Sequence, residues 1–282
     1  MEKIIRNFIH QHEDNNIIIT SEDNRNLTYG EFKKFNEKLS RQLSAQKFKN
    51  EDRVAIVLPN GPYMATAFLG MSSYMSAAPL NPTYTQEEFE FYLNDLKPKF
   101  VIVEFNSSNE VIKAAKNLKI PICELKVTKN NPLGTFQLFE NEEDYINPSS
   151  ETEALVLHTS GTTSRPKIVP LTNKNIFSSA DNIAKSLNLN SSDHCLNIMP
   201  LFHIHGLIAV LAASVKVGAS ICTTNGFNAL KFLELAKSQK ITWYSGVPTM
   251  HQAILLRAEK NKILAKNLNL KFIRSSSASL PP

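Results

Sequence analysis

Short apolar runs alternate with longer amphipathic segments along most of the chain, and this alternation constrains the fold more than any other feature. The apolar runs 53–58, 100–103 and 220–223 read as buried strands, and a segment with helical periodicity follows each of them. This order is typical of parallel sheets whose faces are covered by helices. The sequence therefore predicts an α/β fold with two Rossmann-like lobes of mostly parallel sheet flanked by helices.

Two helix starts are marked by their capping residues. Thr28 precedes Glu31 by three positions, and Thr85 precedes Glu88 by the same spacing. A hydroxyl side chain followed three residues later by glutamate is the capping-box pattern, in which each side chain bonds the backbone N–H of the other residue. We expect helices to begin at both places.

A change in composition divides the chain. Residues 126–153 are rich in Asn, Pro, Glu and Ser, a mixture that favours loops over regular elements. We interpret them as a connection between a first α/β lobe, 1–125, and a second lobe, 154–282.

Composition and charge exclude several classes of protein. The chain has 282 residues, 42% of them hydrophobic, which is enough for a sizeable core. Its net charge of +5 is spread without a basic block, so no nucleic-acid partner is expected. The longest apolar run, 207–215, is too short to span a membrane, and the charged N-terminus is no secretory signal. We expect an intracellular protein.

The cysteines predict neither a disulfide framework nor a metal site. The three cysteines are widely spaced and each lies in an apolar stretch: they are Cys123, Cys195 and Cys222. A disulfide-rich or zinc-binding domain needs closer and repeated spacing. We expect buried free thiols, and no residue is assigned as a metal ligand.

The segment 155–172 holds the densest group of candidate binding residues. A predicted strand runs into a loop with five hydroxyl side chains and one glycine: Thr159, Ser160, Gly161, Thr162, Thr163 and Ser164. Hydroxyls and backbone N–H groups around a glycine can surround phosphate oxygens, and Lys167 adds a positive charge. No Gly-Lys-Ser/Thr opens a helix, so this is not a Walker A loop. Ile168 and Val169 predict a second strand, so the loop joins a hairpin; an ordinary polar hairpin loop is the alternative.

The order Thr-Ser-Gly-Thr-Thr-x-x-Pro-Lys over 159–167 resembles the phosphate-binding signature of the adenylate-forming superfamily, which includes acyl-CoA synthetases, luciferases and peptide-synthetase adenylation domains. Five further segments resemble that superfamily: 27–32, 57–61, 199–206, 243–251 and 274–280. The resemblance covers essentially the whole chain. Within the superfamily the chain is most similar to oxalate–CoA ligases, on segments 158–167, 200–206 and 272–280.

The resemblance implies a reaction and a set of residue roles. ATP and CoA would be co-substrates, with Mg²⁺, and a carboxylic acid would be joined to AMP before transfer to CoA. The loop 159–164 and Lys167 would hold the β- and γ-phosphates, and His203 would border the carboxylate as the catalytic candidate. Three residues would face adenine: Ser276, Ser277 and Ala278. Oxalate or another small acid would need a polar pocket, for which the candidates are His203, His205, His251 and Ser275. The resemblance also implies that the protein is located in the cytoplasm or the peroxisome.

The chain departs from the superfamily at two points. Relatives have glycine where this chain has Ile168, and a β-branched residue would cost about 1–3 kcal/mol if that position needed a positive φ. If the position lies in a strand, isoleucine is harmless. The segments that resemble the superfamily also stop before its adenine-stacking and magnesium-linked residues, its ribose-binding aspartate and its mobile C-terminal lid domain.

Two other interpretations remain at this point. The chain could be a catalytically incomplete relative that acts as a nucleotide-binding or regulatory module. It could also be a fragment without a role of its own, which predicts exposed apolar surface at its C-terminal edge.

Overall fold

The computed structural model describes residues 2–145, 147–159 and 166–280, and in them the predicted α/β fold is confirmed. One sheet has the order β12 (Phe272–Ser275), β11 (Trp243–Gly246), β9 (His194–Asn197), β10 (Ser220–Thr223), β1 (Ile17–Ser21) and β2 (Asn26–Thr28). The other has the order β6 (Ile122–Glu124), β5 (Phe100–Val103), β3 (Arg53–Val57), β4 (Ser76–Pro79), β7 (Glu153–Thr159) and β8 (Lys167–Thr172). We call them sheet A and sheet B.

Most neighbouring strands are parallel, as the alternating pattern predicts. The antiparallel pairs in the described residues are β1 with β2 and β7 with β8, both formed by strands close in sequence. The other pairs join strands through crossovers. Parallel strands require such connections because the chain must return to the same end of the sheet before the next strand.

The sheets do not divide at the predicted connection 126–153. Strands β1 and β2 lie in sheet A with strands from the far end of the chain, and β7 and β8 lie in sheet B with β3–β6. Each sheet is therefore built from both sides of the predicted boundary. The connection itself is partly ordered, with a bridge between Lys126 and Gln137 and a buried Phe136.

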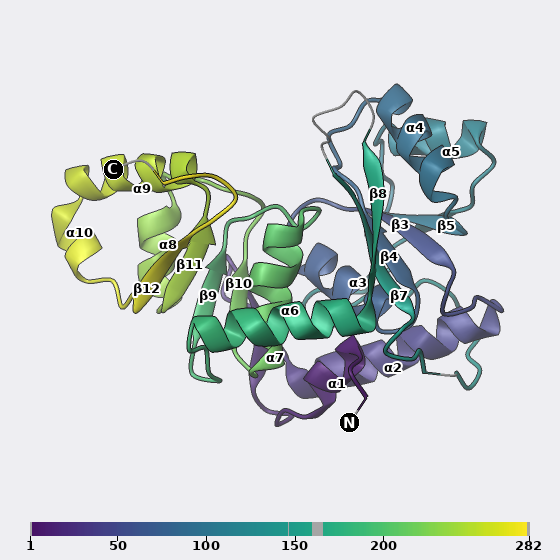
Figure 1. Cartoon of the computed structure of the whole chain (residues 1–282), viewed down its shortest axis with the longest axis horizontal. Helices are drawn as coiled ribbons and strands as arrows, with labels where there is room; N and C mark the ends of the chain where they lie inside the picture. The colour runs from purple at the N-terminus through teal and green to yellow at the C-terminus, as the bar shows by residue number, and fades with distance from the viewer. Residues whose placement is uncertain (1, 146, 160–165, 281–282) are drawn as a thin grey trace.

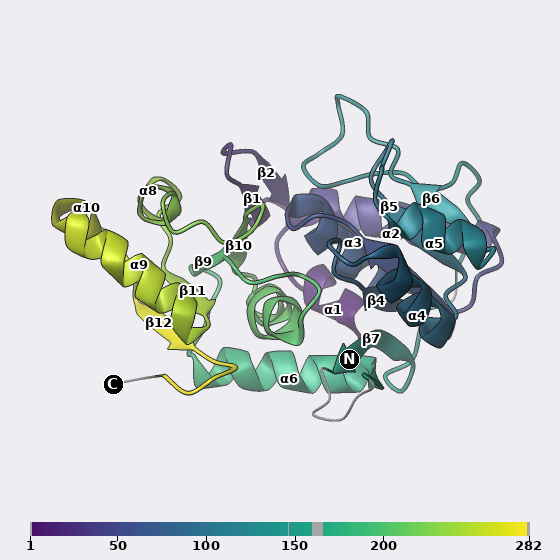
Figure 2. The ribbon, with the colours of Figure 1, turned by 90° about the horizontal axis from the view of Figure 1, so that it is seen from above.

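Helices form three layers around the two sheets (Figure 1). The layer between the sheets contains α1 (Ile5–His10), α2 (Tyr29–Ala45), α3 (Pro62–Ser72), α6 (Asn173–Ser186), the π-helix η1 (His205–Ala212) and α7 (Ala213–Lys216). The outer face of sheet B carries α4 (Gln86–Leu96) and α5 (Val111–Asn117), and that of sheet A carries α8 (Phe232–Ser238), α9 (Pro248–Lys260) and α10 (Lys262–Lys266). Seen from above, α6 runs along one edge of the molecule, next to the other central helices (Figure 2).

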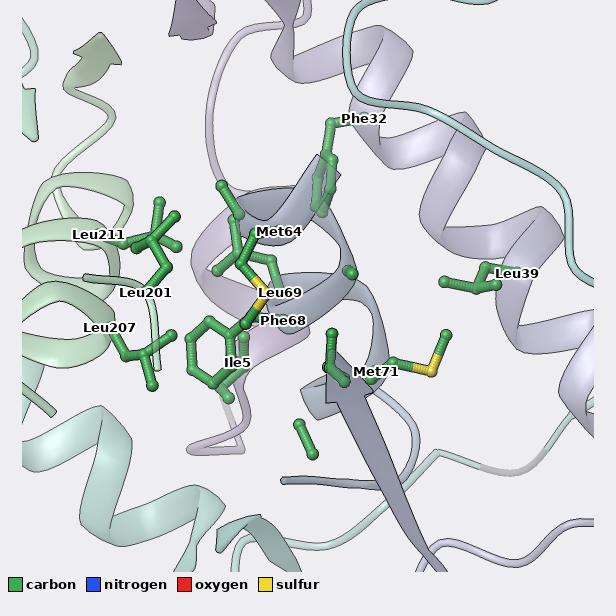
Figure 3. Close-up of a cluster of buried hydrophobic side chains, with 14 of the residues drawn as sticks. Ile5, Phe32, Leu39, Met64, Phe68, Leu69, Met71, Leu201, Leu207 and Leu211 are labelled. Carbon is green, nitrogen blue, oxygen red and sulfur yellow. The ribbon is translucent and has the colours of Figure 1, made fainter. Parts of the chain in front are cut away.

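The central core joins the two sheets. Apolar side chains of α3, η1 and α2 meet there, and Phe68, Leu207 and Leu39 are almost completely buried. Figure 3 shows Phe68 of α3 beside Leu207 of η1. Because α3 contacts β3, β4 and β7 of sheet B as well as β1 of sheet A, this cluster fixes how the sheets face each other.

The capping residues act as predicted. The Thr28 hydroxyl accepts a hydrogen bond from the Glu31 N–H, and the Glu31 carboxylate accepts one from the Thr28 N–H. Thr85 and Glu88 make the same reciprocal pair. Neither α1 nor β1 was predicted from the sequence, because each is short and the run Ile17–Ile19 is too brief to distinguish a strand from a helix turn.

The cysteines are free thiols in the structure, with Cys195 and Cys222 buried and Cys123 half-buried. Burial raises the pKa of the Cys222 thiol to about 11, so it stays protonated at neutral pH. Across the residues that the structure places, no helix has both the length and the apolar character that a membrane crossing requires.

Candidate functional site

A cleft of about 480 Å³ lies where segments of both sheets come together. Its walls come from α4 and the preceding loop, from the β7–β8 hairpin, from the segment before η1, and from the residues that follow β11 and β12. Among the lining residues are Tyr84, Tyr92, His158, Thr159, Met199, Phe202, His203, His205, Val247 and Ser277. The carboxyl ends of parallel strands are where α/β proteins usually bind ligands.

The predicted hairpin is formed by β7 and β8, and residues of both strands line the cleft. Thr159 is the last residue of β7 and pairs with Lys167, the first residue of β8. Both are exposed, and the Lys167 ammonium makes no ion pair with any residue that the structure describes. The predicted phosphate-binding residues Ser160, Gly161, Thr162, Thr163 and Ser164 lie outside the described residues. The described ends of the loop therefore place Thr159 in the wall of the cleft and Lys167 opposite Thr159 on the neighbouring strand.

Ile168 occupies an ordinary strand position. It pairs with His158 across the hairpin, and it is not among the described residues with a positive φ. Its side chain is partly buried against the apolar cluster between sheet B and α4. The departure from glycine at this position therefore adds packing to the strand and creates no backbone strain.

His158 and two tyrosines form a rigid wall of the cleft. His158 Nε2–H donates to the Asp95 carboxylate at 2.9 Å, and the His158 side chain is only 6% exposed. The Tyr92 ring packs against the His158 ring, and the Tyr84 ring stacks on Tyr92 with centroids 4.8 Å apart. Burial raises the pKa of the Tyr84 hydroxyl, which stays neutral. Sequence reasoning missed Tyr84, Tyr92 and Asp95, because nothing local signals that α4 faces the hairpin.

His203 and His205 both reach the cleft, from the turn that leads into η1. The His203 ring is exposed beside Phe202, and the next turn is tied down by the Leu207 N–H, which donates to the His203 carbonyl at 3.0 Å. The neighbouring Gly206 has no room for a side chain, because a Cβ there would overlap the Pro200 carbonyl oxygen. This close approach fixes the position of the two histidines at the N-terminal end of η1.

His205 is buried in a polar network that joins three segments. Its Nδ1 lies 3.0 Å from the Ser277 hydroxyl, and its Nε2 lies 2.7 Å from the Ser245 hydroxyl and 3.1 Å from Nη1 of Arg274. Arg274 also donates to Ser276 at 3.3 Å. Sequence reasoning assigned no role to Arg274, because a single arginine in a short strand gives no signal of its own.

Lowering the pH from 7 to 5 should destabilise the protein through His205. Burial lowers the pKa of His205 to about 4, and the Arg274 guanidinium and His251 act in the same direction. In the unfolded chain this histidine has an ordinary pKa of about 6.5, so below that pH the unfolded chain takes up a proton that the folded chain does not. The contribution of His205 to stability is therefore complete above about pH 6.5 and is lost as the pH falls towards 4. We expect a loss of about 1 kcal/mol in the free energy of unfolding, after allowance for solvent that reaches the ring from the cleft.

Urea unfolding at the two pH values measures this effect, and a His205→Gln variant is the comparison. The variant should lose less stability over the same pH interval, whatever its stability at pH 7. An equal pH dependence in both proteins would contradict the assignment to His205.

The other predicted pocket residues lie elsewhere. His251 and Ser275 line a separate, mostly apolar hollow of about 530 Å³ on the outer face of sheet A, beside α9 and α10. His251 Nδ1 is 3.1 Å from the Tyr244 hydroxyl, whereas His251 Nε2 and the Ser275 hydroxyl are buried without a hydrogen-bond partner among the described residues. The structure thus brings His203 and His205 to one cleft and His251 and Ser275 to another.

The apolar hollow continues into exposed side chains on the C-terminal elements. Large apolar residues that are more than half exposed there are Leu255, Leu256, Ile263, Ile273 and Leu280. Exposed apolar surface at this edge is what the interpretation of the chain as a fragment without a role of its own predicted.

The segment after β12 completes the cleft on the side of sheet A. The Ser276 N–H donates to the Gly246 carbonyl at 3.2 Å, which holds the segment against the end of β11. Ser277 lines the cleft, and Ala278 is exposed next to it.

In the parts of the chain that the structure describes, no three His, Cys, Asp or Glu side chains are grouped so that they could hold a metal ion.

Comparisons with known proteins show the family to which the chain belongs. The family model described as AMP-binding enzyme matches residues 5–282. An oxalate–CoA ligase from Arabidopsis thaliana is 38% identical, with 91% of this chain and 52% of that protein aligned. An oxalate–CoA ligase from Saccharomyces cerevisiae is 33% identical, over 95% of this chain and 55% of that protein. The chain therefore spans about half the length of the curated relatives it matches.

Solved structures show the same fold. Apo MatB from Rhodopseudomonas palustris superposes with a TM-score of 0.82 at 21% identity, covering 99% of this chain and 56% of that one. The inhibitor-bound N-terminal domain of FACL13 from Mycobacterium tuberculosis gives a TM-score of 0.81, also at 21% identity, covering 100% of this chain and 71% of that one. With a family model that spans nearly all of its residues, the chain belongs to the AMP-binding enzyme family.

Proposed function

We propose that this chain forms the ATP- and acid-binding part of an acid–CoA ligase that acts on oxalate or another small acid. The observation that carries the proposal is the cleft that unites Thr159 with His203, His205 and Ser277, with the exposed Lys167 paired to Thr159 at its edge. The relatives named oxalate–CoA ligase, at 38% and 33% identity, support a small acid with two acidic groups. Relatives named 4-coumarate–CoA ligase and sulfoacetate–CoA ligase are less similar, at 28% and 26% identity.

The reaction needs two steps. An oxygen of the carboxylate attacks the α-phosphorus of ATP and forms acyl-AMP, and the bond to pyrophosphate breaks. The sulfur of CoA then forms a thioester with the acyl carbon, AMP leaves, and the thiol proton passes to solvent. Both attacking and leaving groups of the first step are anionic, so positive charge and oriented hydrogen-bond donors must offset their repulsion.

The residues of the cleft fit these roles. Lys167 and Thr159 would hold the β- and γ-phosphates, together with residues 160–164 of the loop. His203 would border the reacting carboxylate from the opposite wall. The segment of Ser276, Ser277 and Ala278 would lie against adenine. Mg²⁺ would accompany ATP as its counter-ion, and none of the described residues is assigned to it.

Lys167→Ala tests the phosphate-binding role, because the Lys167 side chain is exposed and its ammonium makes no ion pair in the described structure, so we expect its removal to leave the fold intact. We expect calorimetry with ATP to show affinity reduced about tenfold, as for the loss of one charge-assisted contact. Lys129→Ala, which removes an exposed lysine from the connection 126–153, should bind ATP as the parent chain does. Equal ATP affinity in the parent and Lys167→Ala would overturn the placement of ATP.

Acid-dependent exchange of pyrophosphate into ATP tests the ligase activity itself, on the protein purified from its native source. Exchange that requires oxalate or another acid supports a ligase. ATP binding without exchange in the presence of any acid would favour the nucleotide-binding module instead.

A further inference from the structure

Arg274 has a half-buried positive charge with no carboxylate beside it. Among the described residues its guanidinium makes no ion pair, and its N–H groups instead meet His205 Nε2 at 3.1 Å, the Ser245 hydroxyl at 3.0 Å and the Ser276 hydroxyl at 3.3 Å. Burying an arginine without an acidic partner is costly, so such a charge usually has a function.

The arginine sets the direction of the hydrogen bonds around it. A guanidinium can only donate hydrogen bonds, so His205 Nε2 accepts from Arg274, and the Ser245 hydroxyl, which accepts from Arg274, donates to the same nitrogen. The proton of the neutral imidazole then lies on Nδ1, which donates to the Ser277 hydroxyl oxygen 3.0 Å away. His205 is 6% exposed, so the protein groups around the ring outweigh water in choosing the tautomer.

Ser277 is the last member of this chain of hydrogen bonds, and it lies in the cleft. Its hydroxyl oxygen accepts from His205, and no other hydrogen bond to this hydroxyl is found in the described structure. Its own proton is therefore free to be donated to a ligand in the cleft. Ser277 also has a φ of +73°, a left-handed conformation that serine seldom adopts and that is often found at functional sites.

We propose that Arg274 is a positioning residue that, through His205, makes the Ser277 hydroxyl donate into the cleft to the second acidic group of the substrate. This relay of Arg274, His205 and Ser277 rests on the proposed function, which places the acid in this cleft. Each member donates towards the ligand, and the permanent charge of Arg274 at its start favours an anionic acceptor at its end. The relay therefore selects acids with two anionic groups over acids with one.

The tautomer of His205 tests the relay without any ligand or activity. Nitrogen-15 NMR of the imidazole rings distinguishes protonated Nδ1 from protonated Nε2, and the His205→Gln spectrum assigns the signals. We expect protonated Nδ1 in the parent chain and in Arg274→Lys, which keeps the charge and a donor. In Arg274→Met the proton should move to Nε2, from which it can be donated to Ser245. Protonated Nε2 in the parent chain, or no change in Arg274→Met, would overturn the relay.

Binding of oxalate and oxamate tests what the relay recognises. The two compounds have nearly the same size, but oxamate has an amide where oxalate has its second carboxylate. We expect the 282-residue chain to bind oxalate about tenfold more tightly than oxamate, as for one charge-assisted hydrogen bond. Arg274→Met and Ser277→Gly should bring the two affinities to within about twofold of each other.

The variants keep the test informative about folding. Ser277→Gly removes the hydroxyl at a position whose φ suits glycine, so it relieves strain. Arg25→Met removes an equal charge from an exposed turn and should retain the oxalate preference. Equal affinities for oxalate and oxamate in the parent chain, or a preference that survives both relay variants, would overturn the proposal. Failure of the proposed function would appear differently, as loss of ATP binding or exchange while the NMR tautomers stay as expected.

Discussion

Replacing Phe68 by alanine should destabilise the protein by about 3–5 kcal/mol, the largest single effect that we expect. Phe68 is completely buried in α3, within the cluster that packs both sheets together. Its ring lies beside Met64, Leu207 and Ile5 (Figure 3), so the substitution leaves a cavity between α3, η1 and α1. His205, which lines the cleft, is the first residue of η1. Because the cavity would loosen η1, we also expect the cleft to lose its shape before the chain unfolds.

Urea unfolding followed by circular dichroism measures the change. Phe105→Ala is the matched control, since Phe105 is 67% exposed and its loss should change stability by no more than about 0.5 kcal/mol. A loss below about 1 kcal/mol for Phe68→Ala would show that the two sheets do not depend on this contact.

Glu153→Ala should cost about 2 kcal/mol of stability, the second largest effect. The Glu153 carboxylate accepts two hydrogen bonds from Arg53, at 2.7 and 2.9 Å, and a third from the Ser76 hydroxyl at 2.7 Å. The Arg53 and Glu153 side chains are 27% and 20% exposed, so the cost lies between that of a surface pair and that of a buried one. Without Glu153, a partly buried guanidinium and a buried hydroxyl lose their partner where β7 joins sheet B.

Glu151→Ala is the control for this pair, because Glu151 meets Lys174 with both side chains more than half exposed. Its removal should change the free energy of unfolding by less than about 0.5 kcal/mol. Similar losses in the two variants would mean that the Arg53 contact contributes no more than an exposed ion pair.

Local pattern was sufficient to predict individual elements but not their partners. The capping boxes at Thr28 and Thr85 predicted two helix starts correctly, because a cap depends on residues three positions apart. That β1 and β2 belong to sheet A could not be predicted in this way. Ile19 pairs with Ile221, and nothing in either short strand specifies the other.

The candidate site shows the same division. The strand pattern of Ile168 and Val169 predicted the hairpin in which Thr159 pairs with Lys167. The resemblance grouped Ser275 with His203, His205 and His251 in one pocket, although successive residues of a strand point to opposite faces of a sheet. Arg274 therefore meets His205 on the inner face, whereas Ser275 lines the hollow on the outer face. The face that each residue takes depends on the register of β12 with β11, which the sequence alone did not provide.

The long-range pairing of β1 has a consequence for synthesis of the protein. Ile19 leaves the ribosome 202 residues before its partner Ile221, and at roughly 5–20 residues per second the interval is on the order of 10–40 s. During that time the apolar run Ile17–Ile19 has no parallel neighbour and is open to association with other nascent chains. Sheet A can therefore close only after Ile221 and its strand have been synthesised, and chaperones that shield β1 until then should raise the yield of native protein.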